Sequence, residues 1–180
     1  FARLGHETEV FSSTAVSPSA KKVIQRPYDP GRSQYEKHGY FVNRLKPVMT
    51  LASNVWARGV KKAVTRFDPD FIVMVGVAKM FGLDVFRIPA ESDARMAAVF
   101  GDAAEYIQRK TFKQKCRALL HDAVFSLVKN RVYRNAVRSL NRIVLNTPET
   151  EKYFRNIIPQ KQIKQFERKK LNLRLGFDPT

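Results

Sequence analysis

The chain has 180 residues, 44% of them hydrophobic, and a formal net charge of +17. This length and apolar content predict one domain with a sizeable core and argue against a disordered chain. No apolar run approaches the roughly 20 residues of a membrane-spanning helix, and no signal segment opens the sequence. The positive charge exceeds what solubility needs and predicts a polyanionic partner, either nucleic acid, an anionic lipid surface or a phosphorylated substrate.

The first residues predict the end of a helix followed by a strand. In FARLGHETEVF, Gly5 is a typical C-cap, and His6 to Ser12 carries β-branched and aromatic residues. A helix that ends in this way normally follows an earlier strand and its turn. We therefore expect a first β-strand upstream of Phe1.

A basic loop and a long helix are predicted next. Residues 13–40 are rich in proline, serine and basic side chains, which predicts a loop with a short edge strand at Lys22 to Arg26. The loop's Lys21 and Lys22 are either solvated or bind an anion. From Phe41 to Phe67, apolar residues at helical spacing predict a long amphipathic helix, in which Trp56 packs.

The stretch 68–88 predicts a strand-helix-strand unit. Phe71 to Val75 is almost wholly apolar, which is typical of a strand buried on both faces. Gly76 ends it, and a short helical segment leads to a second strand at Asp84 to Ile88. Parallel strands need such a crossover, and ligands bind at the carboxyl edge of open parallel sheets. Gly76 and the residues after the second strand are therefore the first candidates for a site.

Polar residues follow that second strand. Glu91, Ser92 and Asp93 come directly after it, and two compatible interpretations stay open. They either cap the short helical piece predicted at Met96 to Phe100 or form part of a ligand site.

The longest helical pattern runs from Lys110 to Leu140. Its apolar stripe includes Leu119 and Leu127, and its opposite face is rich in Lys and Arg. Either the stripe is core and the basic face is solvated, or the helix contacts a membrane or nucleic acid. Cys116 lies in this helix, where we expect it to be buried. As the one cysteine it excludes an internal disulfide and a cysteine metal cluster, and it favours a reducing compartment.

The last third of the chain predicts a strand, a helix and a final strand. Arg142 to Asn146 is the first strand, and Thr147 and Pro148 are a strong start signal for a helix at Glu149 to Asn156. The final strand is predicted at Leu171 to Leu175.

Three stretches in this order carry a resemblance: the opening FARLGHETEVFSS, the strand RFDPDFIVMVG, and SLNRIVLNTPETEKYFRN followed by LNLRLGFDPT. They are similar to three parts of the N-terminal half of family-4-type GT-B glycosyltransferases: the helix ending in Gly-His, the Asp-Pro-Asp strand before the acceptor cleft, and the strand, Thr-led helix and closing Gly-x-Asp. The resemblance covers most of the chain. The family's Gly-rich first turn would lie upstream of Phe1, and its paired glutamates would lie in a second domain after Thr180.

The resemblance implies an α/β fold, a Rossmann-like parallel sheet flanked by helices with its first strand missing. It implies the acceptor-binding half of a glycosyltransferase, inactive alone, that transfers a sugar from a nucleotide-sugar donor to a lipid or saccharide acceptor. Catalytic roles would belong to Glu91 and Asp93, and acceptor binding to Gly76, Ser92 and Arg95, although the His that the family often has at this strand end is absent. No metal and no cofactor are expected in this part of the enzyme, and the nucleotide-sugar donor is expected in the full-length enzyme.

The expected partners are a sugar, lipid or polysaccharide acceptor, the C-terminal domain and an anionic membrane. The residues expected to contact the membrane or a phosphorylated acceptor are Lys21, Lys22, Lys113, Lys129 and Arg131. The expected location is the cytoplasm, with peripheral attachment to the inner face of the plasma membrane as a further option. The alternative is a basic nucleic-acid-binding α/β module, because aromatic residues are interleaved with Lys and Arg, although no helix-turn-helix, zinc or RNA-binding motif occurs.

Overall fold

The structure is a computed structural model that describes most of the chain. The described ranges are 2–15, 29–35, 39–51, 54–77, 81–100 and 130–173. Between the last two ranges it also describes Thr111, Phe112, Lys115, Cys116, Leu119, Ala123 and Leu127. The chain divides into two compact units, Phe1–Pro69 with Lys79–Ile88, and Asp70–Ala78 with Pro89–Thr180. The single domain expected from the length stays a prediction, and each unit is described by itself.

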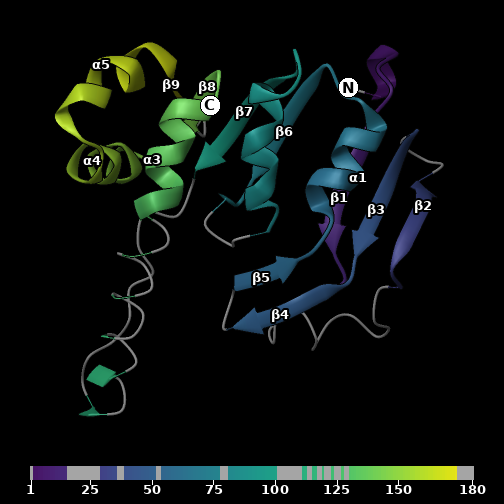
Figure 1. Ribbon diagram of the computed structural model, residues 1–180, viewed down its shortest axis with the longest axis horizontal. Helices are drawn as coiled ribbons and strands as arrows, with labels where there is room; N and C mark the ends of the chain where they lie inside the picture. Colours follow the sequence, from purple (N-terminus) through teal and green to yellow (C-terminus); the bar gives the residue numbers. More distant parts are fainter. Residues whose placement is uncertain are drawn as a thin grey trace, which may run out of the picture. The chain divides into compact units, whose positions relative to one another are not determined.

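The first unit is built mainly from strands. A 3-10 helix, η1 (Ala2–Leu4), ends at Gly5, whose φ of +85° suits glycine, so the predicted helix end and strand are confirmed. Strand β1 (Glu9–Ser13) pairs in parallel with β3 (Tyr40–Leu45), which pairs antiparallel with β2 (Gly31–Tyr35). A separate hairpin joins β4 (Pro47–Leu51) to β5 (Asn54–Ala57), and α1 (Val60–Phe67) follows (Figure 1).

The long helix predicted at Phe41 to Phe67 is therefore wrong over most of its length. Only α1 is helical, and Trp56 lies in β5, paired with Met49 of β4. The segments that form β3, β4 and β5 contain valine, tyrosine, phenylalanine and tryptophan, which favour strands, and strand pairing outweighs their helical spacing. The predicted edge strand at Lys22 to Arg26 lies outside the described residues.

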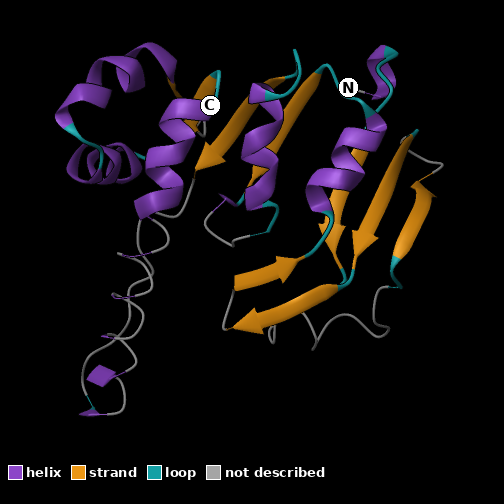
Figure 2. Cartoon of the chain, in the orientation of Figure 1, coloured by secondary structure: helices purple, strands orange, loops and turns teal. Residues whose placement is uncertain are grey.

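The second unit contains a four-stranded parallel sheet (Figure 2). Its strands are β6 (Phe71–Val75), β7 (Arg95–Phe100), β8 (Arg142–Leu145) and β9 (Lys170–Asn172), in that order across the sheet. The register pairs Phe71 with Arg95, and all three neighbouring pairs are parallel. In the described part of this unit the sheet is flanked by the helices α3 (Asn130–Ser139), α4 (Pro148–Ile157) and α5 (Gln160–Lys169). The α/β class with a helix-flanked parallel sheet is thus confirmed.

One predicted strand is wrong. Asp84 to Ile88 lies in a 3-10 helix, η5 (Leu83–Ala90), of which Leu83–Ile88 belongs to the first unit. The second strand of the sheet is β7, which the sequence predicts as a helical piece. Its Met96, Ala97 and Ala98 are good helix formers. However, β7 is paired with a parallel strand on each side, and this tertiary context overrides the local propensity.

The core of the second unit is an aromatic cluster contributed by one strand and three helices. The ring centroid of Phe100 on β7 lies 5.0 Å from that of Tyr133 on α3 and 4.9 Å from that of Phe154 on α4. Phe166 on α5 stacks on Phe154 at 5.1 Å. Each of these four side chains is at most 2% exposed, so the cluster attaches all three helices to the sheet.

Two sequence-based expectations of burial are wrong, and one of two interpretations of the apolar stripe holds over only part of its length. Strand β6 is not buried on both faces, because Phe71, Val73 and Val75 are 51%, 49% and 78% exposed while Ile72 is buried. β6 is the edge strand of its sheet, where alternate side chains point to opposite faces. Leu119 and Leu127 are 70% and 76% exposed, which contradicts the interpretation of the stripe as core at these two positions, while Ala136 and Val137 of the same stripe are buried. Cys116, expected to be buried, is exposed.

Candidate functional site

The carboxyl ends of the four parallel strands form one edge of the second unit's sheet. Gly76 follows β6, Asn146 and Thr147 follow β8, and Leu173 follows β9. Residues 101–110, which follow β7, lie outside the described part of the chain. Ligands of open parallel sheets bind at this edge, so its polar residues are the candidate site.

The start of α4 fixes the position of two hydroxyl groups at this edge. Thr147 is the N-cap in an extended conformation, and its side-chain oxygen accepts a hydrogen bond from the Thr150 backbone N–H at 3.3 Å. Pro148 occupies the first turn, where its missing N–H is not needed. The hydroxyls of Thr147 and Thr150 are 3.0 Å apart, and Thr150 is fully buried. The predicted cap is thus confirmed, and it holds both hydroxyls in place.

Asn146 provides an amide at the same edge. Its backbone N–H donates to the carbonyl of Phe100 at 3.1 Å, which extends the pairing of β8 and β7 by one residue. Its side-chain Oδ1 is buried, and among the described residues it has no hydrogen-bond partner. A buried amide oxygen without a donor is energetically costly, so a hydroxyl or N–H group of a ligand would be stabilising here.

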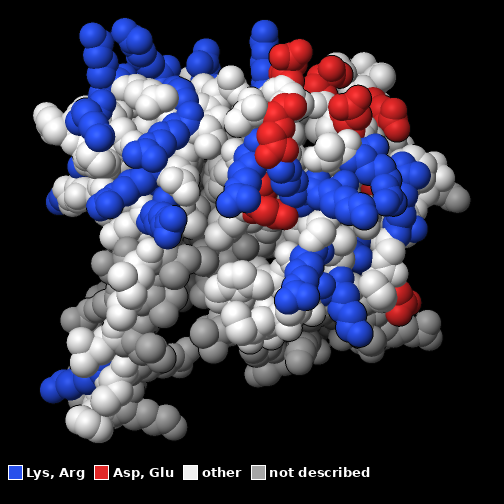
Figure 3. Space-filling model, viewed as in Figure 1, with Lys and Arg blue, Asp and Glu red and all other residues white. Residues whose placement is uncertain are grey.

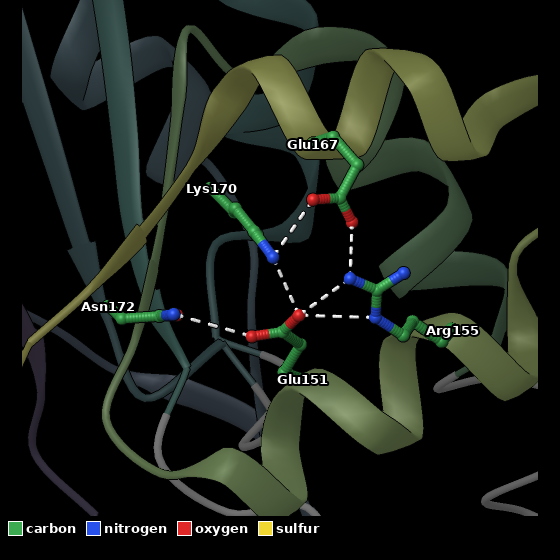
Figure 4. Close-up of polar contacts among 5 residues, drawn as sticks. All are labelled: Glu151, Arg155, Glu167, Lys170 and Asn172. Carbon is green, nitrogen blue, oxygen red and sulfur yellow. Dashed lines mark hydrogen bonds and ion pairs between the residues drawn. The ribbon is translucent and has the colours of Figure 1, made fainter.

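A charged cluster lies on the β9 side of this edge (Figure 4). The Glu151 carboxylate of α4 accepts hydrogen bonds from Lys170 Nζ at 2.6 Å, from Arg155 Nη2 at 2.8 Å and from Asn172 Nδ2 at 3.3 Å. Glu167 of α5 pairs with Arg155 at 2.7 Å and with Lys170 at 2.9 Å. Two carboxylates therefore share two cations, and the cluster links α4, α5 and β9.

The electrostatics of the cluster favour its charged forms. The hydrogen bond from Lys170 is the main cause that lowers the pKa of Glu151, and the same bond raises the pKa of Lys170. The bond to Glu151 also raises the pKa of Arg155. A carboxylate that stays ionised and fully hydrogen-bonded is a poor proton acceptor. We interpret the cluster as a structural clamp and not as an acid–base pair.

Elsewhere in the second unit, burial and hydrogen bonding fix the packing of two further side chains. Burial raises the pKa of Tyr153 to about 12, and its hydroxyl donates to Asn130 Oδ1 at 2.6 Å. Burial lowers the pKa of Lys169, whose Nζ donates to the carbonyl oxygens of Val137 and Arg138 at the end of α3. These contacts join helices to one another. The polar groups that remain as candidates for ligand binding at the carboxyl edge are those of Asn146 and Thr147.

The predicted site residues do not lie together. Gly76 follows the carboxyl end of β6 with a φ of +71°, as predicted for a residue at the ligand edge. Glu91, Ser92 and Asp93 precede β7 and are exposed near its amino end. Strands β6 and β7 are parallel, and the five residues of β6 span about 17 Å. Gly76 lies beyond the carboxyl end of this length, and Glu91, Ser92 and Asp93 lie before its amino end. The expectation that they share one rim is wrong, since it depended on a strand at Asp84 to Ile88.

The residues before β7 have local structural roles. Ser92 Oγ accepts a hydrogen bond from the Ala94 backbone N–H at 3.3 Å, and the Arg95 backbone N–H donates to the Asp70 carbonyl at 2.9 Å. Glu91, Ser92 and Asp93 precede strand β7. The interpretation that they cap a helix is therefore wrong. The catalytic roles of Glu91 and Asp93 and the acceptor roles of Ser92 and Arg95 stay predictions without the geometric reason that motivated them.

Of the five residues expected at a membrane or phosphate, the structure describes one. Arg131 lies on α3 and is exposed. The other four, Lys21, Lys22, Lys113 and Lys129, lie outside the described residues.

Sequence reasoning missed Asn146 and the charged cluster. The sequence predicts Asn146 as the last residue of a strand. No local sequence signal shows that tertiary packing buries its side-chain amide. The cluster has a partial signal, because Glu151 and Arg155 are four residues apart on one helix and form an i,i+4 pair. Lys170 and Asn172 join them only through the parallel pairing of β9 with β8.

Within the described ranges, no group of three or more His, Cys, Asp or Glu side chains is placed to hold a metal ion, and no helix has the length and apolar content to cross a membrane. Comparison of the chain with protein-family models, with curated proteins and with solved structures gives no match in any of the three.

Proposed function

We propose that this chain is the acceptor-binding half of a GT-B-type glycosyltransferase, which transfers a sugar from a nucleotide-sugar donor to a lipid or saccharide acceptor. The observation that carries the proposal is the buried Oδ1 of Asn146, without a hydrogen-bond donor among the described residues, at the carboxyl edge of a parallel sheet. Sugar hydroxyls are suitable donors to such an oxygen.

The chemistry of the edge supports acceptor binding more than catalysis. Asn146 and Thr147 are neutral hydrogen-bonding groups, and the Glu151 carboxylate of α4 is held ionised by Lys170 and Arg155. Gly76 at the end of β6 has no side chain that would prevent a ligand from approaching the backbone. Neutral, fixed polar groups orient hydroxyls, and a second domain would supply the donor site and the remaining catalytic groups.

The test is sugar transfer by the protein with its natural flanking sequence. Nucleotide sugars labelled in the sugar are offered with saccharide and lipid-linked acceptors, and incorporation into the acceptor is measured. Asn146→Ala should raise the KM for the acceptor and lower kcat/KM about tenfold, because one hydrogen bond to a hydroxyl is lost. The KM for the donor should not change.

Glu91→Ala and Asp93→Ala serve as matched controls at the opposite edge of the sheet. If the acceptor binds at the carboxyl edge, as proposed, both variants retain the kcat/KM of the unmodified protein, whereas a loss would support the catalytic roles predicted for Glu91 and Asp93 from the sequence. Absence of transfer from every nucleotide sugar by a folded protein would contradict the proposal, and so would a loss confined to the two control variants.

A further inference from the structure

Two helices of the second unit carry stripes of basic residues on their exposed sides. On α3 the stripe is Arg131, Arg134 and Arg138, and on α5 it is Lys161, Lys164 and Arg168. In each helix the members are three and four residues apart, so they project from one face, opposite the buried residues. All six residues are exposed. Arg134 Nε donates to the Ile157 carbonyl at 2.7 Å, and because this acceptor is neutral the bond leaves the positive charge of Arg134 in place.

The two stripes are joined by contacts between the helices. When the Gln162 amide is assigned with its oxygen facing Arg138, the orientation in which both its polar atoms are satisfied, that oxygen accepts a hydrogen bond from Arg138 Nε at 2.7 Å. Lys169 Nζ donates to the Val137 and Arg138 carbonyl oxygens at 2.9 and 3.2 Å. Figure 3 shows Lys and Arg gathered over α3, α4 and α5, with no acidic side chain among them in this view. We call the six residues of the two stripes the α3–α5 basic face.

Among the described residues, no acidic side chain forms an ion pair with the α3–α5 basic face. Helix α3 contains none, and Glu167, the acidic residue of α5, is engaged with Arg155 and Lys170 in the charged cluster. The six cations are therefore in excess over the anions of their own helices. Such an excess on one face attracts a polyanion.

Exposed apolar residues precede α3 in the chain. Phe112, Leu119 and Leu127 are 82%, 70% and 76% exposed. Exposed phenylalanine and leucine in a stretch of sequence that is rich in Lys and Arg are typical of segments that lie at a membrane surface, where the apolar side chains enter the acyl boundary.

We propose that the α3–α5 basic face, with Phe112, Leu119 and Leu127, binds the surface of an anionic lipid bilayer. This goes beyond the proposed sugar transfer and does not depend on it. A lipid surface fits better than single-stranded nucleic acid, because a stacking platform for bases needs a series of exposed aromatic rings, and among the described residues of this surface Phe112 offers one. On these helices Tyr133, Phe154 and Phe166 are fully buried, and Tyr153 donates its hydroxyl to Asn130.

The test is co-sedimentation of the chain with vesicles of phosphatidylcholine, with and without phosphatidylglycerol. Binding should require phosphatidylglycerol and weaken with salt, since exposed charges act over roughly 8 Å at physiological ionic strength. The triple variant Lys161→Gln, Lys164→Gln, Arg168→Gln should lose on the order of 100-fold in partition coefficient, at about fivefold for each cation. Leu119→Gln and Leu127→Gln should each weaken binding about tenfold at any salt concentration.

A second triple variant controls for net charge. Arg58→Gln, Lys62→Gln and Arg66→Gln remove three exposed cations from the first unit, and this variant should bind as the unmodified chain does. Equal losses in the two triple variants would overturn the proposal, because binding would then follow net charge alone. Tighter binding to duplex DNA or single-stranded RNA at the same ionic strength, with no response to phosphatidylglycerol, would also overturn it. Circular dichroism checks that each variant is folded.

Discussion

Asn146 and Thr147 are neighbours at the end of β8 with different tasks. The Thr147 side-chain oxygen is used within the protein, where it caps α4 through the Thr150 N–H. The Asn146 oxygen is buried without a donor among the described residues. One residue therefore stabilises the helix start, and the other has a buried side-chain oxygen at the ligand edge that is unsatisfied among the described residues.

Glu151 gives a residue-scale prediction for the pH dependence of stability. Its pKa in the folded protein lies below the ordinary value of 4.5, so its ion pairs stabilise the fold above pH 4.5, and this stabilisation is lost as the pH falls toward the folded pKa. Glu151→Gln should lower the free energy of unfolding by about 1 kcal/mol at pH 7. The difference between variant and unmodified chain should shrink below pH 4.5 in urea titrations.

Glu149→Gln is the matched control for this measurement. Both residues lie in the first turn of α4, where a carboxylate interacts favourably with the helix dipole. Glu149 is exposed and takes no part in the cluster drawn in Figure 4. A loss for Glu149→Gln as large as that for Glu151→Gln would show that the dipole, and not the cluster, accounts for the effect.

At the scale of elements, the aromatic cluster holds α3, α4 and α5 on the sheet. Phe100→Ala should lower the free energy of unfolding by about 3 to 4 kcal/mol, because it leaves a cavity against Tyr133 and Phe154. Phe71→Ala removes the same ring from β6, where it is 51% exposed, and should cost much less. Thermal and chemical denaturation measure both. Similar losses at the two positions would contradict this account of the core.

Some elements could be predicted from the sequence because their signals are local. Thr147 and Pro148 mark the start of α4, and the apolar run at Phe71 to Val75 marks β6. Strand β7 could not be predicted, because Met96 to Ala98 favour a helix and become a strand only between β6 and β8. The strand predicted at Asp84 to Ile88 also led to the wrong site prediction. It would have put Glu91 and Asp93 at the carboxyl edge of the sheet, whereas they precede β7 at the amino edge.

At the scale of the whole molecule, the second unit combines a ligand edge and a basic face. The edge is formed by the ends of β6 and β8, and the basic face by the outer sides of α3 and α5. The composition alone shows that the chain is strongly positive. That part of this charge forms one face on α3 and α5 can be seen only in the folded structure. The two proposals concern different residues, so each can fail without the other.

The most direct test of the central claim is an NMR titration of the isotope-labelled chain with neutral oligosaccharides. The claim is that the carboxyl edge of the sheet binds a hydroxyl-rich ligand. Saturable shifts are expected at the backbone amides of Gly76 and Thr147 and at the Asn146 side-chain amide, and Asn146→Ala should weaken binding about fivefold. Shifts centred on Glu91 to Asp93, or saturable binding that Asn146→Ala leaves unchanged, would contradict the claim.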